Sequence, residues 1–345
     1  MTQGTDWRSF ENSLKTEARF FSRTAASQLT SIFDGIGELQ TRDGRPLVVD
    51  AGPGTDFHSL YRARVFQSDD ELKAALGRPD IHLGSPTPLA ADDRMNARGL
   101  SVFYGTNNDN AAVAEVRPPV DSQIVVAQFE IIRKLRLLDL TALGDVRFTG
   151  SLADFGLAGR IESAVFLRTL SGHITRPTML DDEPPGYVAT QAIVDFLATE
   201  ASVPIDGIIF PSVQAAGDVL NVILFHKAAR VEPMNVPEIT EISASTGRWT
   251  EDGWVQEYEV LETISPVSGK VNRSEQKPGW PDFDAIAEAT PLDSRNADRR
   301  DDSLRIVPES VSVHRVKRVE FTTDEFTVRR HCREKPTSVD SGAGR

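Results

Sequence analysis

The amino-acid sequence predicts an α+β protein with a central mixed or antiparallel β-sheet core and flanking helices. Short runs rich in Val, Ile, Leu and Phe, bounded by Gly, Pro, Asn or Asp, recur through the middle of the chain and are typical of strands. They do not alternate regularly with long helical patterns, as a doubly wound parallel sheet would require. With 39% hydrophobic and 26% charged residues, the 345-residue chain can bury a core.

Residues 1–45 are expected to form an N-terminal helical extension. Between Asp6 and Gln40 the apolar residues recur at three- and four-residue steps, which predicts one apolar stripe on a helical hairpin packed against the rest of the protein. A helix lying on a membrane surface is not expected, because the polar face mixes both charge signs. The stripe consists of Phe10, Leu14, Phe21, Ala25, Leu29, Ile32 and Ile36.

Residues 46–231 are expected to form the main domain. Asn108 or Asp109 is a candidate N-cap there, since its side chain can accept a hydrogen bond from a free backbone N–H. The predicted strands are Pro46–Ala51, Ser59–Phe66, Leu100–Gly105, Gln123–Ile131, Arg136–Leu140, Asp206–Pro211 and Val219–His226. The predicted helices are Asp70–Leu76, Asp109–Val116, Ile161–Leu170 and Tyr187–Glu200.

Residues 232–345 are expected to form a C-terminal extension that contains β structure. Asn235–Val260 reads as a short β region, and Ser312–Phe326 alternates in part between apolar and polar residues, which predicts a half-buried strand. Between them, Ser265–Ser303 is rich in Pro, Ser, Asp and Asn and predicts an irregular linker. The tail Arg333–Arg345 is expected to be disordered.

Composition excludes several classes of function. The chain has 38 Lys and Arg against 51 Asp and Glu, a formal charge of −13, which disfavours nucleic-acid binding. The single cysteine, Cys332, cannot build a disulfide framework or a cysteine-based zinc site, and no two of the six histidines have the spacing of metal ligands on a helix. No run approaches the roughly 18 apolar residues of a membrane span, and no signal pattern opens the chain. We therefore expect a cytoplasmic protein without a metal.

The first cluster of candidate functional residues is Tyr61-Arg62-Ala63-Arg64. On a strand, Arg62 and Arg64 point to one face, so that two guanidinium groups can converge on one anion. The alternative is a pair of surface arginines on an edge strand.

A second cluster surrounds Arg94, Asn96 and Arg98, which precede a strand that ends in Tyr104. Glu115 follows on the next predicted helix, on its apolar flank rather than in solvent. A carboxylate in that position needs a partner or a function, because burying a lone charge is costly. An ion pair with Arg117 or another arginine is the alternative.

The remaining candidates are polar residues near strand ends and on a helix. Gln191 lies four residues after Tyr187 and so shares a helix face with it. Ser212 follows a buried strand, and Asn221 lies near the start of the next strand. The sequence contains no dinucleotide-binding GxGxxG loop, no GxxxxGK phosphate loop and no GxSxG nucleophile elbow.

Taken in order, these clusters resemble the RES domain family. The resemblance covers about Ser59 to His226. It rests on Leu60-Tyr61-Arg62, the segment Arg94-Met95-Asn96-Ala97-Arg98-Gly99, Tyr104, the segment Ala112-Val113-Ala114-Glu115-Val116, Thr190-Gln191, the segment Asp206-Gly207-Ile208-Ile209-Phe210-Pro211-Ser212 and Asn221.

The resemblance implies an ADP-ribosyltransferase-like fold and cleavage of the bond between nicotinamide and ribose in NAD, as in toxins of toxin–antitoxin pairs. NAD would then be a substrate rather than a cofactor, and inorganic phosphate or water would be the acceptor. A neutralising antitoxin or immunity protein would be a partner, and the oligomeric state stays open. Glu115, Arg62, Tyr104 and Ser212 would be catalytic, and the substrate-binding residues would be Arg94, Arg64, Tyr61, Asn96, Gln191 and Asn221.

Two alternatives stay open. The chain could be a protein mono-ADP-ribosyltransferase, or a module without activity that senses a nucleotide in the same pocket. Glu257-Tyr258-Glu259 is similar to the acidic pair of arginine-modifying transferases, but it lies outside the matched block and is interpreted as a surface strand.

Overall fold

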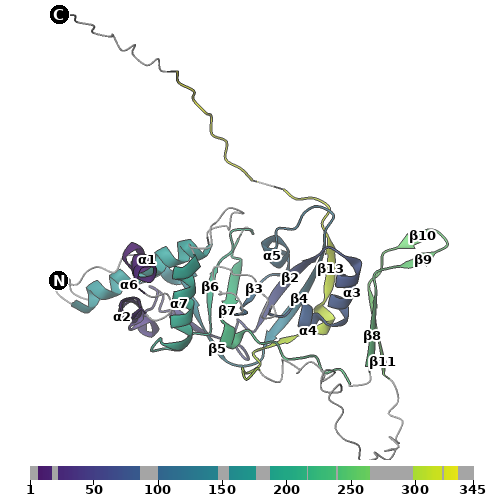
Figure 1. Ribbon diagram of the computed structural model, residues 1–345, viewed down its shortest axis with the longest axis horizontal. Coiled ribbons are helices and arrows are strands. Elements are labelled where there is room, and N and C mark those ends of the chain that lie inside the picture. The colour runs from purple at the N-terminus through teal and green to yellow at the C-terminus, as the bar shows by residue number, and fades with distance from the viewer. Residues whose placement is uncertain are drawn as a thin grey trace, which may run out of the picture.

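The computed structural model describes residues 7–17, 22–85, 100–146, 155–175, 187–215, 217–237, 240–264, 298–320 and 322–332. It confirms the predicted α+β class, with a large curled mixed sheet flanked by helices (Figure 1). The predicted division into residues 1–45, 46–231 and 232–345 stays a prediction. The predicted linker lies for the most part, and the predicted disordered tail entirely, outside the described residues.

A nine-stranded sheet forms the centre of the described structure, in the order β1-β5-β6-β7-β3-β2-β4-β12, with β13 also paired to β4. Only β5 and β6 are paired in parallel, and the other pairs are antiparallel. The strands are β1 (Val48–Ala51), β2 (Ser59–Phe66), β3 (Phe103–Thr106), β4 (Gln123–Ile131), β5 (Leu135–Asp139), β6 (Gly207–Pro211), β7 (Leu220–Leu224), β12 (Leu304–Ile306) and β13 (Ser312–Arg315).

Helices pack on both faces of this sheet. Four of them, α1, α2, α6 and α7, gather on one side (Figure 1), where Phe10, Phe166 and Ile193 share a buried core with Ile208 and Ile223 of the strands. On the other face α3 buries Leu72 and Leu76. The helices are α1 (Trp7–Thr16), α2 (Arg23–Phe33), α3 (Asp69–Gly77), α4 (Pro79–His82), α5 (Asp109–Glu115), α6 (Phe155–Thr175) and α7 (Val188–Thr199).

Most predicted elements agree with the structure to within two residues at either end, and three differ by more. The strand expected over Leu100–Gly105 begins at Phe103, because its partner β7 ends opposite that residue at Leu224. The strand expected over Ser312–Phe326 ends at Arg315, which pairs with the first residue of β4 and so has no further partner on that strand. The helix expected over Ile161–Leu170 runs from Phe155 to Thr175, because core packing outweighs the low helix propensity of its glycines.

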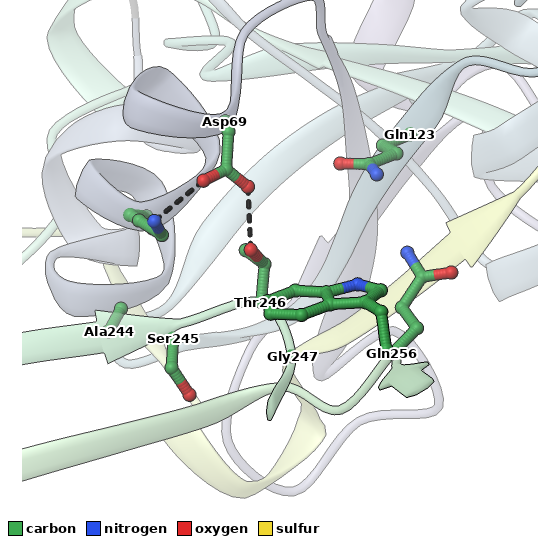
Figure 2. A pocket seen from close by; sticks show the side chains of 9 residues that line it. Asp69, Gln123, Ala244, Ser245, Thr246, Gly247 and Gln256 are labelled. Atoms are coloured by element: carbon green, nitrogen blue, oxygen red, sulfur yellow. Dashed lines mark hydrogen bonds and ion pairs between the residues drawn. The ribbon is translucent and has the colours of Figure 1, made fainter. Parts of the chain in front are cut away.

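Four further strands form an arm that projects from the body (Figure 1). At its base β8 pairs with β11, and at its tip β9 pairs with β10. The hydroxyl of Thr246 joins the arm to the body by donating to Asp69 of α3 over 2.6 Å (Figure 2). The strands are β8 (Thr240–Ser245), β9 (Arg248–Thr250), β10 (Gly253–Val255) and β11 (Glu259–Ile264).

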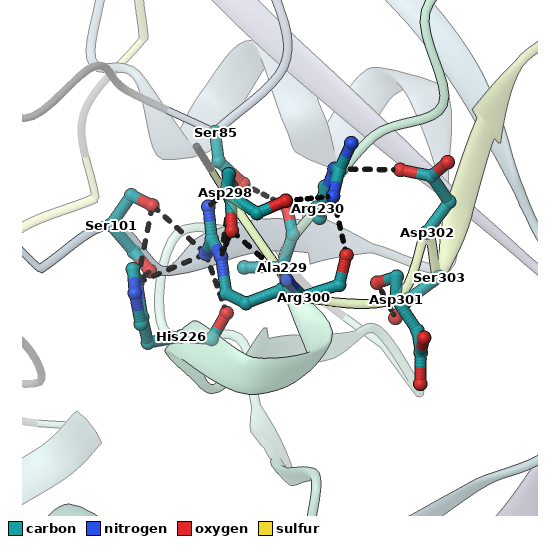
Figure 3. A network of polar contacts seen from close by, with 10 residues as sticks. All are labelled: Ser85, Ser101, His226, Ala229, Arg230, Asp298, Arg300, Asp301, Asp302 and Ser303. Atoms are coloured by element: carbon teal, nitrogen blue, oxygen red, sulfur yellow. Dashed lines mark hydrogen bonds and ion pairs between the residues drawn. The ribbon is translucent and has the colours of Figure 1, made fainter. Parts of the chain in front are cut away.

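The segment that leads into β12 is held to the main domain by a polar network (Figure 3). Arg300 forms an ion pair with Asp298 at 2.6 Å and donates from Nη1 to the carbonyl of His226 over 2.6 Å. Arg230 donates to the carbonyl of Asp298 over 2.7 Å and lies 2.9 Å from the carboxylate of Asp302. These contacts position the C-terminal extension so that β12 and β13 complete the sheet beside β4.

Two features are absent from the described part of the chain. No helix in it is both long and apolar enough to cross a membrane. Nor do three or more His, Cys, Asp or Glu side chains come together there in a group that could hold a metal ion.

Candidate functional site

The last residue of α5 is Glu115, and a polar corner fixes where this helix begins. Asn108 is its N-cap: the side-chain oxygen accepts from the backbone N–H of Ala111 over 3.0 Å, as predicted. The adjacent Asn107 is tied to β7, because its side-chain oxygen accepts from the backbone N–H of Leu220 over 3.0 Å. This corner brings the end of α5 beside the start of β7.

Ser212 directly follows the last residue of β6, where the loop of the β6–β7 hairpin begins. Its backbone N–H donates to the carbonyl of Val219 over 2.9 Å, which closes the hairpin. Its hydroxyl oxygen accepts from the backbone N–H groups of Gln214 and Ala215, each over 3.1 Å. With two donors directed at the oxygen, the hydroxyl proton is free to point toward an acceptor.

That acceptor is Glu115. Its Oε1 accepts from the Ser212 hydroxyl over 2.6 Å and from the Nδ2 of Asn221 over 2.8 Å. Asn221 is 8% exposed, so the second bond comes from a buried amide. Within the described part of the chain, Glu115 forms no ion pair and its Oε2 accepts no hydrogen bond. The carboxylate is therefore held by two neutral donors, with no cation paired to it among the described residues.

One row of residues runs across the sheet beside this carboxylate. Tyr61 of β2 pairs with Thr106 of β3, Thr106 with Asn221 of β7, and Asn221 with Phe210 of β6. Neighbouring strands are about 4.8 Å apart, so that Tyr61 lies roughly 10 Å from Asn221. Arg62 follows Tyr61 directly on β2, so its side chain points to the opposite face of that strand and packs on Phe103 rather than toward α5.

Arg62 is a cation without an acceptor in the described structure. Its Nη1 is buried and has no hydrogen-bond partner, and the guanidinium lies 4.9 Å from the centre of the Phe103 ring. Burial lowers the pKa of Arg62 to about 10, an effect to which the charge of Arg64 adds and which the Tyr104 hydroxyl partly offsets. A buried donor of this kind is costly unless a ligand pairs with it.

The other predicted site residues take different positions. Arg64 is exposed and donates from Nη1 to the carbonyl of His82 over 2.8 Å, so its guanidinium is engaged at the end of α4. Tyr61 packs beside α5, and Tyr104 is partly buried against the helical side of the sheet. Gln191 is buried on α7. Arg94 and Asn96, with Arg98, lie outside the described residues.

Sequence reasoning missed one contributor to the site, Phe103, on which the Arg62 guanidinium packs. The available signal was the order Phe103-Tyr104 on one short strand, since neighbouring residues of a strand face opposite sides. The same alternation separates Phe103 from Tyr104 in the structure, where they belong to different core clusters.

The α+β fold thus carries, among the described residues, a carboxylate held by two neutral donors, Glu115, and a buried guanidinium nitrogen without an acceptor, in Arg62. The sequence model of the RES domain matches residues 59–245, which is more than half of the chain, and the protein therefore belongs to the RES domain family. RES domains are generally linked to NAD-related toxin function. Arg62, Tyr104, Glu115, Ser212 and Asn221 all lie inside the matched region. A search of curated proteins finds no match to the chain.

Proposed function

We propose that this protein is an enzyme that cleaves the nicotinamide–ribose bond of NAD, with phosphate or water as the acceptor. The observation that carries the proposal is the carboxylate of Glu115, held at Oε1 by Ser212 and Asn221. Two neutral donors fix its position without cancelling its charge. The scissile bond breaks through a positively charged ribose, which a fixed anion stabilises more strongly than it stabilises the ground state.

Two buried atoms without partners support NAD as the ligand. Nη1 of Arg62 lacks an acceptor, and Oδ1 of Asn221 lacks a donor. A phosphate oxygen suits the guanidinium, because arginine pairs with phosphate through several directed N–H groups. A ribose hydroxyl suits the amide oxygen, because it can donate one hydrogen bond. A ligand with both groups satisfies both atoms, and NAD carries diphosphate and ribose hydroxyls.

The reaction needs little acid catalysis from the protein. The bond's electron pair leaves with nicotinamide, which departs as a neutral molecule, and an oxygen of phosphate or water forms the new bond to the same ribose carbon. Phosphorolysis gives ADP-ribose 1″-phosphate, nicotinamide and a proton, whereas hydrolysis gives ADP-ribose, nicotinamide and a proton. Glu115 would face the ribose carbon through Oε2, and Arg62 would hold the diphosphate or the attacking phosphate.

Mass spectrometry of the products distinguishes the acceptors. Purified protein is incubated with NAD in phosphate-free buffer and in buffer that contains phosphate. A phosphorylated ADP-ribose that appears only with phosphate identifies an NAD phosphorylase, and ADP-ribose in both buffers identifies a glycohydrolase. ADP-ribose attached to protein, with neither free product, would instead identify a protein ADP-ribosyltransferase. Intact NAD in every condition would reject the proposal.

The link of the family to toxins adds a cellular test. Expression of the wild-type protein is expected to lower cellular NAD and arrest growth, while the Glu115→Gln variant at equal abundance does neither. A neutralising partner protein belongs to the same proposal, and it would restore growth when expressed together with the wild-type protein. Growth arrest by Glu115→Gln with normal NAD would show that any toxicity has another cause.

A further inference from the structure

A pocket lies between the arm and the body, and it shares no residue with the Glu115 site. Its volume is about 300 Å³. Asp69 and Lys73 of α3 and Gln123 of β4 come from the body, whereas Thr246, Trp254 and Gln256 come from the arm. In Figure 2, Gln123 and Gln256 lie on one side of the hollow, with Asp69 and Thr246 on the other.

Trp254 supplies this pocket with a rigid aromatic surface. Its ring meets that of the cross-strand partner Trp249 edge-on, with centroids 5.7 Å apart. It also lies directly on the backbone of Gly247, where an added Cβ would come within 2.4 Å of Trp254 Cζ2. Trp254 nevertheless stays 53% exposed. Contacts with Gly247 and Trp249 hold this ring in place, and about half of its surface stays exposed. Such a ring can stack on a planar ligand without being reordered first.

The polar groups around the pocket select what can stack there. The amide of Gln123 has no hydrogen-bond partner among the described residues, and Gln256 donates to the hydroxyl of Tyr258, which leaves its own oxygen as an acceptor. A glutamine amide offers a donor and an acceptor side by side, the pattern that matches the N6 and N7 edge of adenine. Asp69 is oriented by Thr246 and Lys73 and adds an acceptor for an exocyclic amino group.

Charge excludes a phosphorylated ligand. The first turn of α3 contains Asp69, Asp70 and Glu71, and the only described cation that lines the pocket, Lys73, is paired with Asp69 at 2.6 Å. A phosphate group would be repelled by these carboxylates. We propose that this pocket binds a neutral, planar nitrogen heterocycle with an exocyclic amino group, such as adenine, stacked on Trp254 and recognised by Gln123.

Isothermal titration calorimetry with adenine tests this site on the full-length protein. Stacking on an aromatic side chain is worth about 1–3 kcal/mol per base, so Trp254→Ala should weaken adenine binding by about 5- to 150-fold. Gln123→Ala should weaken it by about 10-fold through loss of the paired hydrogen bonds. Gly247→Ala should also weaken binding, because the new Cβ would displace the Trp254 ring.

Two controls separate this pocket from other effects. Val255→Ala truncates an exposed apolar side chain of the same hairpin outside the pocket and should leave adenine affinity unchanged. Nicotinamide release from NAD by Trp254→Ala should match the wild-type rate, so the pocket and the proposed reaction are tested independently.

Three results would overturn the proposal: no heat with adenine at millimolar concentration, equal adenine affinity in the wild type and Gln123→Ala, or binding of methyl glucoside in place of adenine. If Trp254→Ala does not fold by circular dichroism, Gln123→Ala and Gly247→Ala decide the outcome, because each alters the pocket by another route.

Discussion

The hydroxyl of Ser212 has one proton, and its surroundings direct that proton to Glu115. Two backbone N–H groups already occupy the hydroxyl oxygen as an acceptor. A hydrogen bond to a charged group contributes about 1.5–3 kcal/mol, so Ser212→Ala should lower the kcat of NAD cleavage by about 10- to 100-fold. Ser212→Thr keeps the hydroxyl and should retain more activity, as measured by nicotinamide release. A wild-type kcat for Ser212→Ala would show that this bond does not position the carboxylate.

The buried guanidinium of Arg62 is expected to lower the free energy of unfolding, and its proposed contact with the NAD diphosphate explains why it is present. Its folded-state pKa of about 10 lies below the ordinary value of an arginine side chain, because burial disfavours the charged form. Below pH 10 the group is protonated in both the folded and the unfolded chain, so this cost is present in full and constant through neutral pH. It is relieved only as the pH rises above about 10.

Arg62→Met should therefore raise the free energy of unfolding by about 1–3 kcal/mol at pH 7, since it replaces an unpaired buried charge with an apolar side chain. The same variant should lose NAD cleavage. Urea unfolding from pH 6 to 9 measures the first effect, which should not vary with pH. Arg64→Met, which removes an exposed guanidinium and its hydrogen bond to the carbonyl of His82, is the matched control and should stabilise the protein less than Arg62→Met. Lower stability of Arg62→Met than of the wild type would mean that Arg62 has an acceptor in the folded protein.

At the scale of single residues, the sequence predicts the identity of the candidate site residues more successfully than the contacts between them. Glu115, Ser212 and Asn221 stand out by type and position, but the two donors lie 97 and 106 residues from the carboxylate, so no local pattern shows that they share one oxygen. Strand alternation places Arg62 and Arg64 on one face. It does not show that Arg64 turns to the carbonyl of His82, because long side chains adopt many rotamers.

At the scale of the elements, the segment before β12 is held in place partly through His226, which Arg300 contacts. The pKa of His226 is lowered, first by burial and then by the charge of Arg300, whereas Asp298 and Asp195 oppose the shift. A histidine with a lowered folded-state pKa takes up a proton more readily in the unfolded chain. Its contribution to stability is therefore present above the unfolded-state pKa of about 6.5 and is lost as the pH falls below it.

His226→Gln tests this link. The wild-type free energy of unfolding should fall between pH 7 and pH 5, and the variant should show a shallower fall in urea titrations. The pKa of His82 is also lowered by burial, so some dependence on pH should persist in the variant. His314→Gln changes a half-buried histidine of β13 outside this network and is the control. If the free energy of unfolding changes with pH by the same amount in the wild type and in His226→Gln, this account of the network is contradicted.

In the whole molecule, the sheet extends beyond the region that matches the RES domain. Leu304 of β12 is fully buried and Ile306 is 3% exposed, in the same core cluster as Phe129 of β4. Leu304→Ala should therefore lower the free energy of unfolding by about 2–5 kcal/mol. A protein truncated after residue 245 would lose both β12 and β13 and should not unfold cooperatively in urea. Equal unfolding midpoints for the truncated and full-length proteins would show that the extension is dispensable.

The sequence predicts the class of the fold and most of its longer strands, because alternation and bounding turn residues are local signals. It does not predict that β12 joins β4, since β12 has three residues and follows a long polar stretch whose composition does not specify a partner. The helices of the N-terminal segment can be predicted from their apolar stripe. Their packing with α6 and α7 on one face depends on contacts between residues far apart in the chain.

The measurement that tests the central claim most directly is the rate of nicotinamide release from NAD by three proteins: the wild type, Glu115→Gln and Glu162→Gln. Glu162 is an exposed carboxylate on α6 and serves as the matched control. We expect equal rates for the wild type and Glu162→Gln, and a rate lower by about 10²- to 10³-fold for Glu115→Gln, the usual effect of losing a preorganised electrostatic group. Nicotinamide release by Glu115→Gln at the wild-type rate, or none by any of the three, would contradict the account.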